Sequence, residues 1–143
     1  MHETNFSRKP RGEKPVTVVI IDDSAEFLST ISNFFEENLA QEISIVGQAK
    51  GAASAIKQVS EKKPKVVLLD LKMPDMHGFD VIPRLKKIDK QLLIVVTTLL
   101  PVEYDEQTVV IYTESAKIAG ADGFIPKDKL TTGLVEMLSL IHI

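Results

Sequence analysis

Charged and hydroxyl side chains follow four separate apolar runs in this sequence, each at the point where a run ends. They are Asp22 and Asp23 after residues 16–21, Asp70 after 66–69, Thr97 and Thr98 after 92–96, and Lys127 after 123–126. If the runs are strands of one parallel sheet, their carboxyl ends meet at a single edge, where open α/β sheets bind ligands. We therefore expect three carboxylates, two hydroxyls and one ammonium group to share a site.

Such a group of side chains is suited to phosphoryl transfer. Three close carboxylates repel one another, and Mg²⁺ relieves that repulsion in sites with few carboxylates and several waters. An Asp carboxylate can accept a phosphoryl group as a nucleophile. The Lys127 ammonium can hold one phosphoryl oxygen and the Thr97 hydroxyl a second. Metal and lysine would then neutralise charge on the group during an in-line displacement.

The elements that must position these residues alternate between strand and helix patterns. Residues 66–69 are apolar without a break, which is typical of a strand buried on both faces. We expect strands at residues 16–21, 43–46, 66–69, 92–97 and 123–126. Helical spacing of apolar residues predicts helices after Ser24, over 52–59, over 79–88, over 108–119 and from 130 onward, with Gly120 as a C-cap. The first of these has an apolar stripe that begins at Phe27, whose ring we expect in the core. Pro83 predicts that the regular part of the third helix starts late.

This alternation predicts an α/β fold with a doubly wound, five-stranded parallel sheet and helices on both faces. Among the common strand orders, 2-1-3-4-5 places the first and third strands together at the topological switch point. It would bring Asp22 and Asp23 beside Asp70. The predicted architecture is flavodoxin-like.

Composition narrows the class of protein. A chain of 143 residues with 44% hydrophobic and 26% charged residues fits one globular domain. There are no cysteines, which excludes disulfides and thiolate metal sites, and the apolar runs are strand-sized, so we expect a cytoplasmic protein. Residues 1–15 resemble a disordered basic arm, and residues 16–143 form the domain. The net charge of −3 gives no reason to expect direct nucleic-acid binding by this chain, although an output domain outside it would be free to bind DNA.

Four motifs in chain order resemble the receiver domain of two-component response regulators. They are Ile-Ile-Asp-Asp-Ser at 20–24, Leu-Leu-Asp-Leu-Lys-Met-Pro-Asp-Met-His-Gly at 68–78, Ile-Val-Val-Thr-Thr at 94–98, and Gly-Ala-Asp-Gly-Phe-Ile-Pro-Lys-Asp at 120–128. The combination is specific and covers the chain from residue 16 onward. Two features depart from the family's usual pattern. Asp128 follows the lysine where Pro is common, and the segment 98–106 is longer than usual.

The resemblance implies a role for each matching residue. Asp70 resembles the phosphoacceptor. Asp23 resembles the direct Mg²⁺ ligand, with Asp22 acting mainly through water. The backbone carbonyl of Lys72 would be a further ligand. Thr97 resembles the switch hydroxyl and Lys127 the phosphoryl-binding lysine. Phe124 is either an aromatic switch residue that would turn inward on activation or a packed core phenylalanine.

The resemblance also implies a regulatory function. The domain would take a phosphoryl group from the phosphohistidine of a histidine kinase or a phosphotransfer protein. It would then change its affinity for partners, including a second copy of itself, through the fourth helix, the fifth strand and the last helix. It would not be an enzyme beyond self-catalysed phosphoryl transfer and autodephosphorylation.

Three alternatives belong to other classes. A pseudo-receiver would be an interaction module that is never phosphorylated, and the complete set of acids, hydroxyl and lysine argues against it. A phosphatase with an Asp nucleophile would need a second acid two residues after Asp70, where this chain has Lys72. A flavin-binding domain would need a hydroxyl-rich phosphate loop where Asp22 and Asp23 would repel the phosphate.

Overall fold

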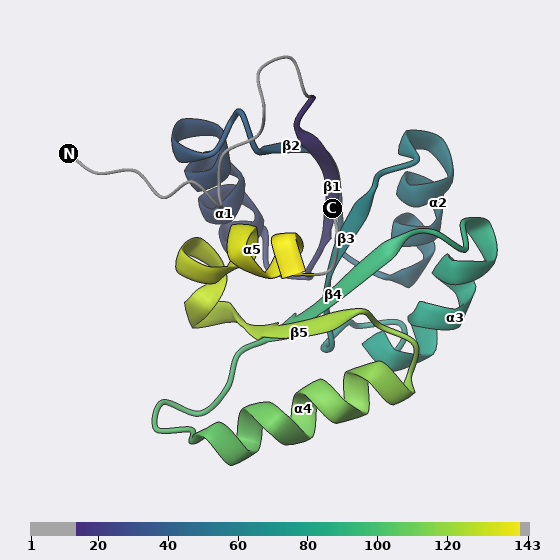
Figure 1. Ribbon diagram of the computed structural model, residues 1–143. Helices are drawn as coiled ribbons and strands as arrows, with labels where there is room; N and C mark the ends of the chain where they lie inside the picture. The colour runs from purple at the N-terminus through teal and green to yellow at the C-terminus, as the bar shows by residue number, and fades with distance from the viewer. Residues whose placement is uncertain (1–13, 141–143) are drawn as a thin grey trace.

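Five parallel strands form one sheet, which lies between two layers of helices (Figure 1). The computed structural model describes residues 14–140, so the predicted arm 1–15 lies almost wholly outside the described residues. The strands are β1 Val16–Ile21, β2 Ile43–Ala49, β3 Val66–Asp70, β4 Leu93–Thr98 and β5 Gly123–Pro126. Their order is β2-β1-β3-β4-β5, which confirms the predicted topology.

The helices connect successive strands and cover both faces of the sheet. They are α1 Ala25–Asn38, α2 Ala52–Lys62, α3 Gly78–Ile88, α4 Glu106–Ile118 and α5 Leu130–Leu140, with a short 3-10 helix at Lys127–Lys129. Helices α1 and α5 cover one face, and α2, α3 and α4 the other (Figure 1). The Ser24 hydroxyl accepts the Phe27 N–H at 3.1 Å, as predicted for an N-cap. Within residues 14–140, no helix is long and apolar enough to cross a bilayer.

Strand β3 is the centre of the core, because all five of its residues are buried. One apolar layer joins it to α1 and α5 through Leu28, Ile31, Phe35, Leu130, Leu134 and Leu138. The opposite layer joins it to α2, α3 and α4 through Ala55, Val59, Val81, Ile82, Leu85 and Ala116. A strand held on both faces gives a fixed position to the carboxylate at its end.

The third helix differs from its prediction. It begins at Gly78 and continues through Pro83, whereas the sequence indicated a late start. Pro83 is exposed, while the two residues before it, Val81 and Ile82, are buried, so packing outweighs the lost backbone hydrogen bond. The His77 ring supplies the N-cap, since its Nδ1 accepts the Phe79 N–H at 3.1 Å.

The segment between β4 and α4 is anchored in its middle. Leu100 is 8% exposed and packs into the core, whereas Leu99 is 69% and Val102 98% exposed. Helix α4 begins at Glu106, two residues earlier than predicted, because the Asp105 carboxylate accepts the Thr108 N–H at 2.9 Å. The helix has its C-cap at Ala119, and Gly120 follows with a φ of 108°, a left-handed conformation that favours glycine.

The loop after β3 is attached to the start of α2 by one carboxylate. Asp75 accepts the Ala52 N–H at 2.8 and 3.0 Å and the Ala53 N–H at 3.3 Å. The N-cap of α2, Gly51, has no side chain to perform this role. The hydrogen bonds from Ala52 and Ala53 lower the pKa of Asp75 below its ordinary value of 3.8. Asp75 therefore caps a helix from a distant part of the sequence.

We expect Asp75→Ala to lower the urea midpoint of unfolding, because two backbone N–H groups lose their acceptor. A lowered folded-state pKa contributes stability that is complete above the ordinary value of 3.8 and is lost as the pH falls through the folded value. The difference between parent and variant should thus shrink in acid. Glu61→Ala, a change near the opposite end of the same helix, is the control. A midpoint of Asp75→Ala equal to that of the parent at neutral pH would contradict this capping role.

Candidate functional site

The strand register brings the predicted site residues to one edge. Asp70 is the direct cross-strand partner of Thr97. Asp22 follows Ile21, whose partner is Leu69, so Asp22 lies beside Asp70. Lys127 follows β5, whose last residue is in register with the last residue of β4. The site is therefore built by parallel pairing of four neighbouring strands.

The three carboxylates form a compact acidic cluster. Asp22, Asp23 and Asp70 each offer one oxygen, and these oxygens lie within 4.8 Å of one another. Asp22 and Asp70 are buried, and Asp23 is exposed. Burial raises the pKa of Asp70, the charge of Asp22 raises it further, and Lys127 and the Lys72 N–H oppose the rise. The pKa is raised because burial and the neighbouring acid together outweigh the lowering by Lys127 and the Lys72 N–H.

These donors fit a hard divalent cation. Carboxylate oxygens are ligands that Mg²⁺ prefers, and it keeps several waters when bound by one or two carboxylates. The exposed Asp23 leaves the cluster open to solvent on one side, so a partly hydrated ion can approach. Three carboxylates beside a single lysine ammonium supply the electrostatic attraction.

The Lys127 ammonium group lies between two of the acids. Its Nζ is 2.7 Å from Asp22 Oδ2 and 3.7 Å from Asp70 Oδ2. The side chain is 15% exposed, so little water separates these charges. The ammonium is therefore closer to Asp22 than to Asp70, and a small movement would bring it to an oxygen bound on Asp70.

Thr97 presents a buried hydroxyl that is unpaired in the described part of the chain. The residue is 1% exposed, and its Oγ1 has no hydrogen-bond partner within residues 14–140. Leaving a buried hydroxyl unpaired is costly, and such groups in native structures call for an explanation. Because Thr97 is paired with Asp70 across the strands, an acceptor bound at Asp70 would satisfy it.

Phe124 does not have the outward starting position that an inward turn requires. Its ring is 3% exposed and stacks on Tyr112 of α4, with centroids 5.2 Å apart and planes at 17°. The inward position predicted for an activated state is thus already occupied in this structure. The packed position agrees with the core reading of Phe124, and the stacking partner on α4 provides its physical reason.

Two contacts at this edge were missed by the sequence analysis. The Phe27 ring lies under the Lys127 ammonium, with Nζ 4.4 Å from the ring centroid, although its spacing had assigned it to the core. The Tyr104 hydroxyl donates to the Asp128 carboxylate at 3.0 and 3.1 Å, which joins the segments after β4 and β5. The position of Phe27 in the first turn after an acid pair was an available signal, whereas the Tyr104 pair has none.

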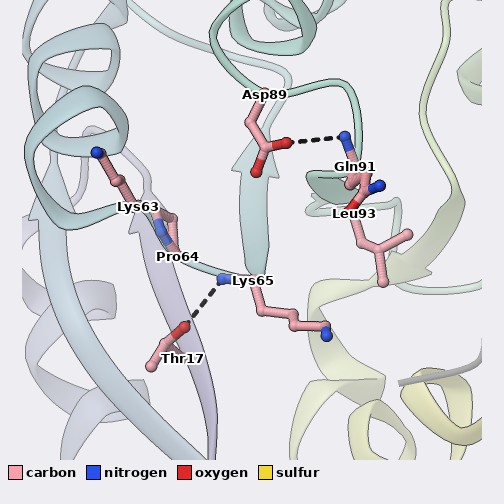
Figure 2. Close-up of a pocket in the computed structure, with 7 residues that line it drawn as sticks. All are labelled: Thr17, Lys63, Pro64, Lys65, Asp89, Gln91 and Leu93. Carbon is pink, nitrogen blue, oxygen red and sulfur yellow. Dashed lines mark hydrogen bonds between the residues drawn. The ribbon is translucent and has the colours of Figure 1, made fainter.

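A pocket lies at the opposite edge of the sheet, near the start of β1, and it differs in its lining from the acidic site. It is lined by Thr17, Lys63, Pro64, Lys65, Asp89, Gln91 and Leu93 (Figure 2). The Lys65 N–H donates to the Thr17 hydroxyl and the Gln91 N–H to the Asp89 carboxylate, both at 2.9 Å. These lining groups satisfy one another, which is typical of loop stabilisation.

Comparison with known proteins identifies relatives along nearly the whole described chain. The sequence profile of the response regulator receiver domain matches residues 18–139. The chemotaxis protein CheY of Thermotoga maritima is 31% identical over 124 residues, 87% of this chain and 95% of that protein.

The nitrate/nitrite response regulator NarL of Escherichia coli (strain K12) is 29% identical over 126 residues, 88% of this chain and 54% of that protein. A protein-glutamate methylesterase of Shewanella sp. (strain MR-4) is 31% identical, and the match covers 80% of this chain and 30% of that protein. The chain thus spans only part of the length of several relatives.

Solved structures share the fold. A LuxR-family response regulator from Aurantimonas sp. SI85-9A1 has a TM-score of 0.74 at 20% identity, covering 90% of this chain and 85% of that one. The response regulator domain of Thermotoga maritima CheB has a TM-score of 0.72 at 21% identity, covering 91% and 98%. The profile match, the identity to CheY along nearly its whole length and the shared fold lead to one conclusion. The chain belongs to the receiver-domain family of two-component response regulators.

Proposed function

We propose that Asp70 accepts a phosphoryl group from the phosphohistidine of a histidine kinase or a phosphotransfer protein. The observation that carries this proposal is the buried Thr97 hydroxyl directly across the strands from Asp70, which has no hydrogen-bond partner among residues 14–140, together with the Lys127 ammonium 3.7 Å from the same carboxylate. A pseudo-receiver would have no use for this arrangement. The role is regulatory, and any chemistry the domain performs is on its own phosphoryl group.

The reaction is an in-line displacement at phosphorus. A carboxylate oxygen of Asp70 attacks, a P–O bond forms, and the P–N bond to the donor histidine breaks with its electron pair left on nitrogen. Lys127 moves from Asp22 toward a phosphoryl oxygen, and the Thr97 hydroxyl donates to another. Both groups stabilise charge where it develops.

Mg²⁺ is the proposed cofactor, and it would neutralise charge on the acids and the phosphoryl group when bound. Asp23 and Asp70 would hold it directly, Asp22 through water, and the Lys72 carbonyl would complete the set of protein ligands. The CheY of Borrelia burgdorferi, a neighbour with a TM-score of 0.70, was crystallised in a complex with CheX, beryllofluoride and Mg²⁺. Beryllofluoride is accordingly a suitable stand-in for the phosphoryl group here.

The proposed output surface is formed by α4, β5 and α5. Helix α4 has one fully buried side chain, Ala116, and its outer face exposes Val110, Ile111 and Ile118 at 50%, 55% and 87%. A helix with few buried contacts can shift at low cost, and exposed apolar residues bind partners, including a second copy. The stack of Phe124 on Tyr112 connects β5 to this helix.

The first prediction concerns the acceptor. With Mg²⁺ and acetyl phosphate, the parent should gain one phosphoryl adduct by intact-protein mass spectrometry, and Asp70→Asn should gain none, because its amide is not a nucleophile. Asp75→Asn, the same substitution in the loop after β3, is the control and should still gain the phosphoryl adduct. An adduct that persists in Asp70→Asn would refute the assignment.

The second prediction concerns the acids and the cation. In EDTA at neutral pH, Asp70→Asn should raise the urea midpoint, because a carboxyl with a raised folded-state pKa destabilises the fold once it is ionised. Below pH 3.8, Asp70 is protonated in both the folded and the unfolded protein, so the difference in urea midpoint between Asp70→Asn and the parent should vanish there. Mg²⁺ at a hundredfold excess over its Kd should stabilise the parent by about 2.7 kcal/mol, and Asp70→Asn by less. Equal stabilisation of both proteins would contradict Asp70 as a ligand.

The third prediction concerns the route to α4. Beryllofluoride with Mg²⁺ should shift the NMR signals of Tyr112 and Phe124 in the parent, because Thr97 moves toward the bound group and its strand neighbours follow. Thr97→Val keeps the branched shape but removes the hydroxyl, and should confine the changes to the acids and Lys127. Unchanged Tyr112 and Phe124 signals in the parent would disprove this coupling.

A further inference from the structure

We propose that Phe27 is a positioning residue for Lys127, which keeps the ammonium group within reach of both Asp22 and Asp70. This inference rests on the proposed function, because the movement it assists is the one that brings Lys127 to a phosphoryl oxygen. The pattern of the sequence placed Phe27 in the apolar stripe of α1. Its place in the structure gives it a second role.

Three groups surround the Lys127 ammonium. Asp22 Oδ2 is 2.7 Å and Asp70 Oδ2 is 3.7 Å from Nζ, and the centroid of the Phe27 ring is 4.4 Å from it. The lysine side chain is 15% exposed, so carboxylates and ring together exclude most of the water from it. The Phe27 ring thus lines one side of the space that the Lys127 ammonium occupies.

An aromatic ring at this position is compatible with movement of the Lys127 ammonium. An ammonium group is attracted to an aromatic face out to about 6 Å from the centroid, and the attraction has no single preferred hydrogen-bond direction. A carboxylate or amide in the same place would hold Lys127 at one point. A ring lets the ammonium leave Asp22 for an oxygen on Asp70 while it stays out of water. An aliphatic side chain would give the volume without the attraction.

The local fold sets the ring in place. Ser24 caps α1 through the Phe27 N–H at 3.1 Å, so Phe27 lies in the first turn, directly after the acid pair. Phe34 offers a natural comparison on the same helix. It is also half-buried against the same apolar layer, but its ring packs edge-on against Phe35 at 5.9 Å. Loss of packing can therefore be separated from loss of the contact with Lys127.

The experiment compares Phe27→Leu, Phe27→Tyr and Phe34→Leu with the parent. The measurements are the rate of phosphorylation by acetyl phosphate with Mg²⁺ and the affinity for beryllofluoride. We expect Phe27→Leu to lower both by roughly three- to tenfold, which lies between the effects of an exposed and of a fully desolvated cation–π contact. Phe27→Tyr retains an aromatic face and should restore both to within about twofold of the parent. Phe34→Leu should leave both unchanged, and urea midpoints of all variants report any loss of stability.

A second measurement needs no phosphoryl group. The ε-methylene protons of Lys127 should show an upfield ring-current shift in the NMR spectrum of the parent and of Phe34→Leu, and should lose it in Phe27→Leu. Absence of this shift in the parent, or parent-like rates in Phe27→Leu, would overturn the role of Phe27. Failure of Phe27→Tyr to restore the rates would do the same. A parent that binds neither phosphoryl group nor beryllofluoride would instead refute the proposed function, and the Lys127 shift would still report on the contact.

Discussion

Repulsion among three carboxylates at one sheet edge is the constraint on which the rest of the molecule depends. The parallel register forces Asp22 and Asp70 together, and burial removes much of the water that would screen them. Lys127 offsets part of this cost from the end of β5, and it can do so only because β5 is in register with β4. Holding these buried charged groups therefore lowers the stability of the fold relative to a core of apolar residues.

The surrounding structure fixes some of the connections at this edge and leaves one element loosely held. Asp75 attaches the loop after β3 to α2, and the Tyr104–Asp128 pair joins the segments after β4 and β5. Helix α4, by contrast, has one fully buried side chain and is connected to β5 by the stack of Tyr112 on Phe124. A change of charge at the edge would therefore meet the Asp75 anchor on the β3 side, and the Tyr104–Asp128 pair and the stacked helix α4 on the β5 side.

Local sequence patterns predicted the strands, the helices and the site residues. They did not predict contacts between residues that are distant in the sequence. The apolar runs, the acids that end them and the Ser24 cap follow from neighbouring residues, so the strand order and the acid cluster were predictable. Pro83 misled because burial of Val81 and Ile82 outweighs a local preference. The Asp75 cap joins residues 23 positions apart and the Tyr104–Asp128 pair 24, and no periodicity reports such contacts. Phe27 satisfied the core pattern, and its ring also contacts the ammonium of Lys127.

The charge balance of the edge connects the proposed cation to the proposed phosphoryl group. Three carboxylates and one ammonium leave a formal charge of −2, since three negative charges are offset by one positive charge. Converting Asp70 to an acyl phosphate removes one carboxylate charge and adds about two negative charges on phosphoryl oxygens, so the edge becomes more negative by about one. A divalent cation bound beside it is then held more tightly than before. Because such coupling is reciprocal, a bound cation must favour the phosphorylated state by the same free energy. If Asp70 is phosphorylated as proposed, the metal affinity and the phosphorylation equilibrium of this site cannot be adjusted independently.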